Sequence, residues 1–248
     1  MINLEKDPKI LRYMDLTKLM DFVVFNRIYF CQVDQYDDIF EGLFPKPIYD
    51  LAKNITITKP NDTKSNNGII EGTKQRRKQH YVSCWTLGGA ENMALWKLYG
   101  GKNGIAIQTT LSILKDELEN SVKKNNDSTN AMIRQANFKV SEIKYLDHKN
   151  LDMESIKSEH INDPVMYKNS AYSYENEVRF AYDTIFPALH QRLGKGFYIS
   201  INAENIIKKC LISPSADECF YELIEALLSK YNLNNCVSWS DLRFPPFQ

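Results

Sequence analysis

The stretch at 174–180, Tyr-Glu-Asn-Glu-Val-Arg-Phe, constrains the fold more than any other part of the chain. Side chains alternate between the two faces of a strand, so a strand here places Glu175, Glu177 and Arg179 on one face. The other face then carries mostly Tyr, Val and Phe, which favour a half-buried pleated surface. The sequence therefore predicts a core strand with a charged face, whose charges either form a functional site or pair as solvated neighbours.

The composition sets the class of protein. A chain of 248 residues with 43% hydrophobic residues can bury a sizeable core, and we expect one domain over residues 1–248 with a flexible loop at about 54–72. Lys and Arg total 31, as do Asp and Glu, so no overall field attracts nucleic acid or an anionic membrane.

The cysteines and the apolar segments bear on the compartment. Five cysteines occur without a Cys-x-x-Cys motif or clustered histidines, which suits a reducing compartment and argues against a zinc site. No apolar run is long enough to cross a membrane, and the first residues do not look like a secretory signal. We therefore expect a soluble cytoplasmic protein without a bound metal.

Hydrophobic periodicity predicts a strand, a helix and a strand at the start of the chain, over 9–13, 16–26 and 28–33. A further strand at 80–86 carries Ser83 and Trp85 on one face, with Tyr81 beside them. The mixture of strands and helices favours the α+β class. The other predicted helices lie at 91–100, 111–124, 151–172, with an interruption at Pro164, and 216–231, and the other strands include 104–108, 197–201 and 206–212.

Two charged features allow more than one interpretation. Arg12, inside an apolar strand, either pairs with a carboxylate or binds an anion, because burying it bare is costly. Asp37, Asp38 and Glu41 form an acidic turn that could bind a metal, but their spacing is not that of an EF-hand, which favours a solvated or Arg-paired turn. The glycine pairs near 88 and 100 form neither a dinucleotide fingerprint nor a phosphate-binding loop.

The order of these features resembles two families. Arg12, then Ser83, then Glu175-x-Glu177 follow the order seen in ADP-ribosyltransferases of the Arg-Ser-Glu type. Residues 11–13, 82–85, 93–99 around Trp96, 104–107 and 174–179 resemble the bacterial domain-of-unknown-function family 2971. The acidic turn of that family typically reads Asn-Asp-Pro-Phe-Glu, and this chain departs from it at Asp37 and Ile39.

The ADP-ribosyltransferase resemblance implies a mixed, mainly antiparallel split β-sheet with flanking helices, and NAD bound as substrate between the strands. Glu177 would stabilise the charge that develops on the ribose, and Glu175 would orient or deprotonate the acceptor. Ser83 would position Glu177 or the ribose. The implied NAD-binding residues are Arg12, Tyr13, Ser83, Tyr81 and Trp85, and further candidates are Asp38, Glu41, Trp96, Tyr99 and Arg179.

Three alternatives stand beside this interpretation. In the first, Arg12 and Arg179 neutralise Glu175 and Glu177, and Ser83 completes a buried polar network. In the second, the protein is a non-catalytic module that senses a nucleotide or a protein, and in the third it is a hydrolase that uses a metal at the acidic turn. For an enzyme, the acceptor is open between protein, nucleic acid, small molecule and water. By analogy of fold, a toxin or anti-phage effector controlled by an antitoxin is expected.

Overall fold

The computed structural model of the protein describes residues 6–38, 40–43, 75–124, 137–147, 164–183 and 195–243. The predicted opening is confirmed as β1 (Lys9–Met14), α1 (Leu16–Val24) and β2 (Arg27–Gln32). Asp15 caps α1, because its side chain accepts a hydrogen bond from the Lys18 amide at 2.8 Å. The predicted loop at 54–72 lies outside the described residues.

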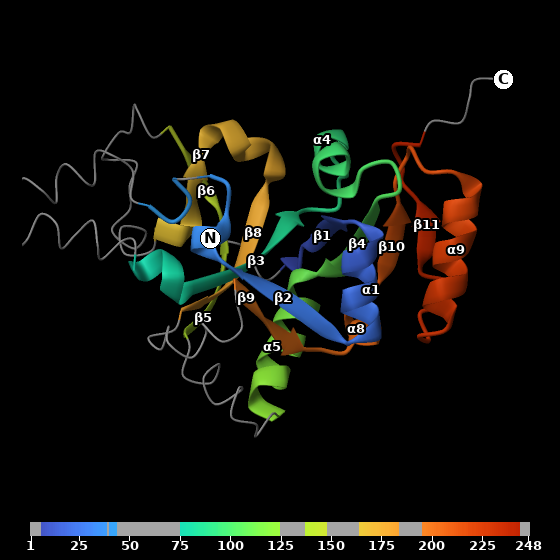
Figure 1. Ribbon diagram of the computed structural model, residues 1–248, viewed down its shortest axis with the longest axis horizontal. Helices are drawn as coiled ribbons and strands as arrows, with labels where there is room; N and C mark the ends of the chain where they lie inside the picture. Colours follow the sequence, from blue (N-terminus) through green and yellow to red (C-terminus); the bar gives the residue numbers. More distant parts are fainter. Residues whose placement is uncertain are drawn as a thin grey trace, which may run out of the picture.

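The centre of the sheet is β3 (His80–Leu87), and the sheet forks on one of its edges (Figure 1). Along its other edge β3 pairs with β8 (Glu177–Asp183), which continues to β5 (Asn137–Glu142). At the forked edge β1 pairs with one end of β3 through Leu11 and Thr86, and β2 pairs with the other end through Cys31 and Val82. Between these two pairings, β1 and β2 separate.

Each limb of the fork carries further strands. The limb of β1 continues to β4 (Ile105–Thr110), β10 (Lys209–Ile212) and β11 (Val237–Trp239), and that of β2 to β9 (Gly196–Ser200). Among the described residues these strands form one nine-stranded sheet. Every pairing in it is antiparallel except that of β10 with β11. The predicted mixed, mainly antiparallel sheet with flanking helices is therefore confirmed.

Helices α1, α5 (Leu111–Lys124) and α9 (Glu218–Ser229) bury their apolar sides in the main core, which includes Trp85 and Phe180. Helix α8 (Ala203–Ile206) joins this core through Ala203 and Ile206. Two smaller clusters lie apart from the main core. One surrounds Trp96, in the turn formed by α4 (Met93–Leu95) and η3 (Trp96–Gly100), and the other surrounds Val82 and Val165.

The predicted helix at 151–172 is wrong over its described part. Residues 164–166 form the 3₁₀ turn η5 (Pro164–Met166), and β7 (Tyr167–Asn169) then pairs with β6 (Lys144–Leu146). The chain turns again because the Asn169 side chain accepts a hydrogen bond from the Ala171 amide and caps η6 (Ser170–Glu175). The chain from Pro164 onward therefore forms separate short elements instead of the second part of a helix.

Two strand boundaries also differ from the prediction. Strand β8 begins at Glu177, because Asn176 adopts the left-handed conformation with φ of 43° and Glu175 ends η6. The predicted strand at 206–212 is shortened, since α8 ends at Ile206 and β10 begins at Lys209. The predicted helices at 111–124 and 216–231 are confirmed as α5 and α9.

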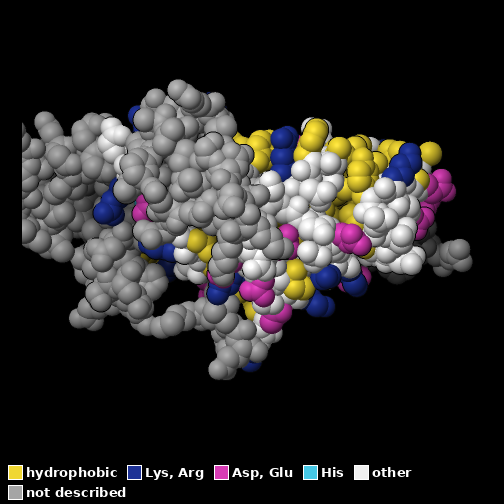
Figure 2. All heavy atoms as spheres, turned by 90° about the horizontal axis from the view of Figure 1, so that it is seen from below, with side chains coloured by type: hydrophobic (Ala, Val, Ile, Leu, Met, Phe, Trp, Pro, Cys, Tyr) yellow, Lys and Arg dark blue, Asp and Glu magenta, His cyan; other side chains and the backbone are white. Residues whose placement is uncertain are grey.

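The face of the molecule seen in Figure 2 carries described side chains of both charges. Figure 2 shows acidic and basic side chains interspersed with hydrophobic ones over the described part of one face, in keeping with equal numbers of acidic and basic residues. Within the ranges that the structure describes, none of the helices has the length and apolar character needed to span a bilayer.

Candidate functional site

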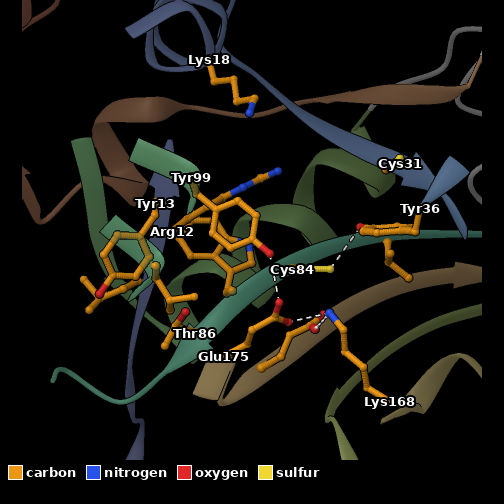
Figure 3. A pocket seen from close by; sticks show the side chains of 15 residues that line it. Arg12, Tyr13, Lys18, Cys31, Tyr36, Cys84, Thr86, Tyr99, Lys168 and Glu175 are labelled. Carbon is orange, nitrogen blue, oxygen red and sulfur yellow. Dashed lines mark hydrogen bonds and ion pairs between the residues drawn. The ribbon is translucent and has the colours of Figure 1, made fainter. Parts of the chain in front are cut away.

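A cavity of about 250 Å³ lies where β1 and β2 separate along β3, and we call it the fork cavity (Figure 3). Trp85 reaches it from one face of β3, whereas Cys84 and Thr86 reach it from the other, so the cavity extends into the gap between the two strands. Among the predicted site residues, those that line it are Arg12, Tyr13, Trp85, Tyr99, Glu175 and Glu177.

Arg12 provides the cationic end of the fork cavity. Its Nη1 donates to Ser83 Oγ at 3.0 Å, and its guanidinium carbon lies 5.7 Å from the centroid of the Trp85 ring. The Trp85 indole N–H donates to the same hydroxyl at 3.1 Å, so Ser83 fixes both groups. In the described part of the chain no carboxylate lies within ion-pair distance of Arg12. The guanidinium therefore has donors left for an anionic ligand.

Ser83 lies on the opposite face of β3 from Glu177. In the pairing of β3 with β8, Thr86 lies opposite Glu177 and Cys84 opposite Arg179, so these four side chains share one face. Ser83 points to the other face, where its hydroxyl contacts Arg12 and Trp85. Ser83 therefore orients Arg12 at the fork and has no contact with Glu177, whereas its predicted role toward the ribose stays a prediction.

The opposite end of the fork cavity holds Glu175 and Glu177 around a common lysine. Lys168 Nζ lies 2.5 Å from Glu175 Oε2 and 3.3 Å from Glu177 Oε2. The Tyr99 hydroxyl donates to Glu175 Oε1 at 3.0 Å, as Figure 3 shows. Sequence reasoning missed Lys168, because it stood inside the predicted helix at 151–172 and carried no motif of its own.

A fully buried arginine lies beneath these carboxylates. Arg179 contacts Glu177 through Nε and Glu41 through Nη1, both at 2.5 Å, and Nη1 also donates to the Val165 carbonyl at 2.6 Å. Lys168 Nζ is 3.9 Å from Glu41. Three carboxylates thus face two cations, Lys168 and Arg179, and the cluster carries one net negative charge when all five groups are ionised.

The acidic turn is therefore paired with arginine at its last residue. Glu41 is buried beside Arg179, whereas Asp37 is exposed and Asp38 accepts a hydrogen bond from the Phe40 amide at 2.9 Å. Across the described ranges, no group of three or more His, Cys, Asp or Glu side chains is arranged to hold a metal ion.

The two pocket glutamates differ in pKa. Burial by itself raises the pKa of Glu177, but the charge and hydrogen bonds of Arg179, together with Lys168, lower it to about 2. Burial raises the pKa of Glu175 above its ordinary value even though Lys168 opposes this, and the charge of Glu177 raises it further. Glu177 is thus held as an anion, whereas Glu175 takes up a proton more readily.

A comparison with known proteins bears on this site. Residues 95–180 match DUF2971, a family of proteins of unknown function. The DUF2971 match supports the family resemblance expected from the sequence, and its span includes Tyr99, Lys168 and the strand that begins at Glu177, whereas Arg12 and Ser83 precede it. No curated protein and no solved structure matches the chain.

One predicted residue, Trp96, lies behind the wall of the cavity, against Tyr13, which lines it. Trp96, in the DUF2971 segment, donates to Glu91 Oε2 at 2.9 Å and meets the Tyr13 ring edge-on, with ring centroids 5.0 Å apart. The Tyr13 hydroxyl accepts from the Asn92 amide at 2.9 Å, and burial raises the pKa of Tyr13 to about 12. Trp96 therefore supports the cavity wall through Tyr13.

Tyr81 lies apart from the other predicted residues. It is fully buried in the main core, where its ring centroid is 5.0 Å from that of Phe197, and it does not line the fork cavity. The structure places other side chains there instead, of which Tyr36 and Cys84 lie in contact, with 3.2 Å between the hydroxyl and the sulfur. Sequence reasoning gave no site role to Cys84, although it lies in the 82–85 motif, or to Lys18, which also lines the fork cavity.

Proposed function

We propose that this protein cleaves the bond between nicotinamide and ribose in NAD, and transfers the ADP-ribosyl group to an acceptor or to water. The observation that carries the proposal is the layout of the fork cavity, which has at one end a cation that pairs with no carboxylate of the described residues, and at the other end two clustered carboxylates. A substrate with phosphates on one side and a sugar that becomes positively charged on the other suits that layout.

The phosphate side of the substrate has three kinds of donor. Arg12 offers a planar fork suited to phosphate oxygens, and Lys18 lines the same cavity. The Gly88 amide donates across the forked edge to the Lys9 carbonyl, and amides two residues apart along a strand point to the same edge. The Cys84 amide therefore points into the gap between β1 and β2, where it can donate to a phosphate oxygen.

The sugar side of the substrate would lie at the glutamates. When the bond from the ribose C1′ to the nicotinamide nitrogen breaks, nicotinamide leaves with the electron pair and positive charge develops on the ribose. Glu177 remains ionised and stabilises that charge. Glu175 accepts the proton from the acceptor as the acceptor oxygen or nitrogen bonds to C1′. With water as acceptor, the product is free ADP-ribose.

Nicotinamide release from NAD tests the proposal. Purified protein is incubated with NAD and bacterial lysate, and nicotinamide is measured by chromatography for wild type, Glu177→Ala and Glu175→Gln. Release by wild type that both variants lose supports the proposal, with exposed Glu204→Gln as a control that keeps activity. Far-ultraviolet circular dichroism shows whether each variant is folded. No release, with no thermal shift by NAD, would overturn the proposal.

A second function is favoured by one observation. Both carboxylate oxygens of Glu177 are occupied, Oε1 by Arg179 and Oε2 by Arg179 and Lys168. A carboxylate held this way serves a sensor that binds a nucleotide without cleaving it. Binding of NAD without nicotinamide release would select the sensor. In either case a role as a toxin or anti-phage effector, with an antitoxin as partner, belongs to the proposal.

A further inference from the structure

A second cavity of about 330 Å³ lies between α1 and the limb formed by β2 and β9, and we call it the limb cavity. It shares Arg12 and Lys18 with the fork cavity. Along β2 the two cavities are neighbours, because Cys31 lines the first and Tyr29, two residues earlier on the same face, lines the second. The two cations therefore stand at the junction of two adjoining cavities.

Two tyrosine rings and the Arg27 guanidinium form part of the wall of the limb cavity. Tyr29 and Tyr198 lie directly opposite each other in the pairing of β2 with β9, and their ring centroids are 5.1 Å apart. The Arg27 guanidinium carbon lies 3.9 Å from the Tyr198 centroid and 4.4 Å from that of Phe25. Asp21 accepts from Arg27 Nε at 2.9 Å and fixes the orientation of the guanidinium. Tyr198 is nonetheless 43% exposed, so its ring is accessible to a ligand.

The sizes of the cavities indicate a ligand in two parts. A site for one drug-sized molecule usually measures about 300–1,000 Å³. The fork cavity, at about 250 Å³, is smaller than this range and the limb cavity, at about 330 Å³, stands at its lower end. A dinucleotide, with two ring systems joined by phosphates, would place one ring system in each cavity and its phosphates at the shared cations.

We infer that the limb cavity binds the base and ribose of a nucleotide whose phosphates lie at Arg12 and Lys18. This inference rests on the proposed function, under which that nucleoside is the adenosine half of NAD. Aromatic rings and a stacked guanidinium offer a surface on which any nucleobase stacks. Phosphate contacts to Arg12 and Lys18 fix its position, since both cations border the two cavities.

Binding of two partial ligands to the full chain tests the inference. ADP would occupy the limb cavity and the shared cations, whereas nicotinamide mononucleotide would occupy the fork cavity and the same cations. By calorimetry, we expect Tyr198→Ala to weaken ADP about tenfold, within the range for loss of one base stack. Nicotinamide mononucleotide should bind as in wild type, and Tyr198→Phe should keep the affinity for ADP.

Phe25→Ala is the matched control. Phe25 contacts Arg27 and is 62% exposed, but it does not line the limb cavity. This variant should bind ADP within about twofold of wild type, because the wall of the cavity stays intact. The inference is overturned if wild type does not bind ADP, or if Tyr198→Ala binds it as wild type does.

The outcomes for the limb cavity and for the proposed function are separate. Nicotinamide release from NAD with unchanged ADP binding in Tyr198→Ala would overturn the inference and leave the proposed function standing. ADP binding that depends on Tyr198, without nicotinamide release, would support the limb cavity as a nucleotide site and reject the glycosidic chemistry.

Discussion

Arg12 and Arg179 lie in the same sheet but have opposite surroundings. Arg179 is fully buried and contacts two carboxylates and a carbonyl, so its charge is neutralised by the protein itself. Arg12 is half-buried and contacts a hydroxyl and an indole ring, neither of which carries a negative charge. Because a bare charge is costly to bury, Arg179 stabilises the fold, whereas Arg12 is available to a ligand.

Replacing Arg179 tests its structural role. Arg179→Met should lower the free energy of unfolding by about 3–5 kcal/mol, because Glu41 and Glu177 then remain buried with Lys168 as their common cation. Urea unfolding measures the change. Lys102→Met removes an exposed pair with Asp217 and should change the free energy by less than about 0.5 kcal/mol. A loss in Arg179→Met as small as in this control would contradict the structural role.

The pKa values of the glutamates predict a dependence of stability on pH. The folded-state pKa of Glu177 is about 2 against an ordinary value of 4.5, so its stabilising contribution is present above pH 4.5 and is lost as the pH falls toward 2. The difference in unfolding free energy between wild type and Glu177→Gln should therefore shrink over that interval.

For Glu175 the same experiment should give a pH dependence of stability with the opposite sign. The raised pKa of Glu175 means that its ionisation lowers the stability of the folded protein. The unfolding free energy of wild type should therefore rise relative to that of Glu175→Gln as the pH falls through the acidic range. Urea unfolding at several pH values, from about 6 to about 3, follows both differences. Parallel trends in the two variants would show that the pKa values are not shifted in opposite directions.

At the scale of elements, the turn at Asn176 brings the two glutamates together. We expected one continuous strand to place Glu175 and Glu177 on the same face, whereas Glu175 ends η6 and Asn176 turns in the left-handed conformation. The Asn176 side chain donates to the Leu87 carbonyl at 2.7 Å, and this ties the turn to the end of β3. The carboxylates therefore meet through a turn and through Lys168.

Substitution of Asn176 tests the turn. Asn176→Ala should lower the free energy of unfolding by about 1–2 kcal/mol, because alanine tolerates the left-handed region poorly and the bond to Leu87 is lost. Asn176→Gly should cost less, since glycine has no such penalty. Asn235, at φ of 60° in an exposed turn, gives a matched control. Asn235→Ala should lower the stability without affecting NAD binding, whereas Asn176→Ala should lower the stability and also weaken NAD binding.

Local patterns predicted the elements better than their assembly. Strands such as β1 and β3 and helices such as α5 and α9 follow from alternation or helical spacing within one segment. The fork depends on the register of β1 and β2 along β3, and these pairings join residues about 50 or more positions apart in the chain, which leaves no local signal. The position of Lys168 and the identity of the arginine that pairs with Glu41 could not be predicted for the same reason.

At the scale of the whole molecule, the sheet holds its two limbs together through β3. Arg12 stands between the limbs and borders both cavities, so it is the one predicted NAD-binding residue whose loss should affect both halves of a dinucleotide. Lys18 also borders both cavities but is 66% exposed and pairs with Asp15. The position of Arg12 in the sheet therefore determines which ligands it can contact.

Replacing Arg12 tests this position. Arg12→Ala should weaken ADP and nicotinamide mononucleotide alike, by about 10- to 100-fold, because charge-assisted bonds to phosphate are lost from both. Calorimetry measures each affinity. The stability of the unliganded protein should change little, because no carboxylate loses its partner. An effect on one ligand alone would show that the cavities do not share this cation.

The strand order also has a consequence for how the chain is made. The strands at the fork come from the first part of the chain, but the fork cavity needs Lys168 and Glu175, and the limb cavity needs Tyr198. During synthesis, β2 therefore cannot complete its pairing until β9, which pairs with most of the length of β2, has been made. Neither cavity exists on a ribosome-bound chain that stops short of these residues. A regulatory protein that recognises the assembled fork would thus select finished molecules over nascent ones.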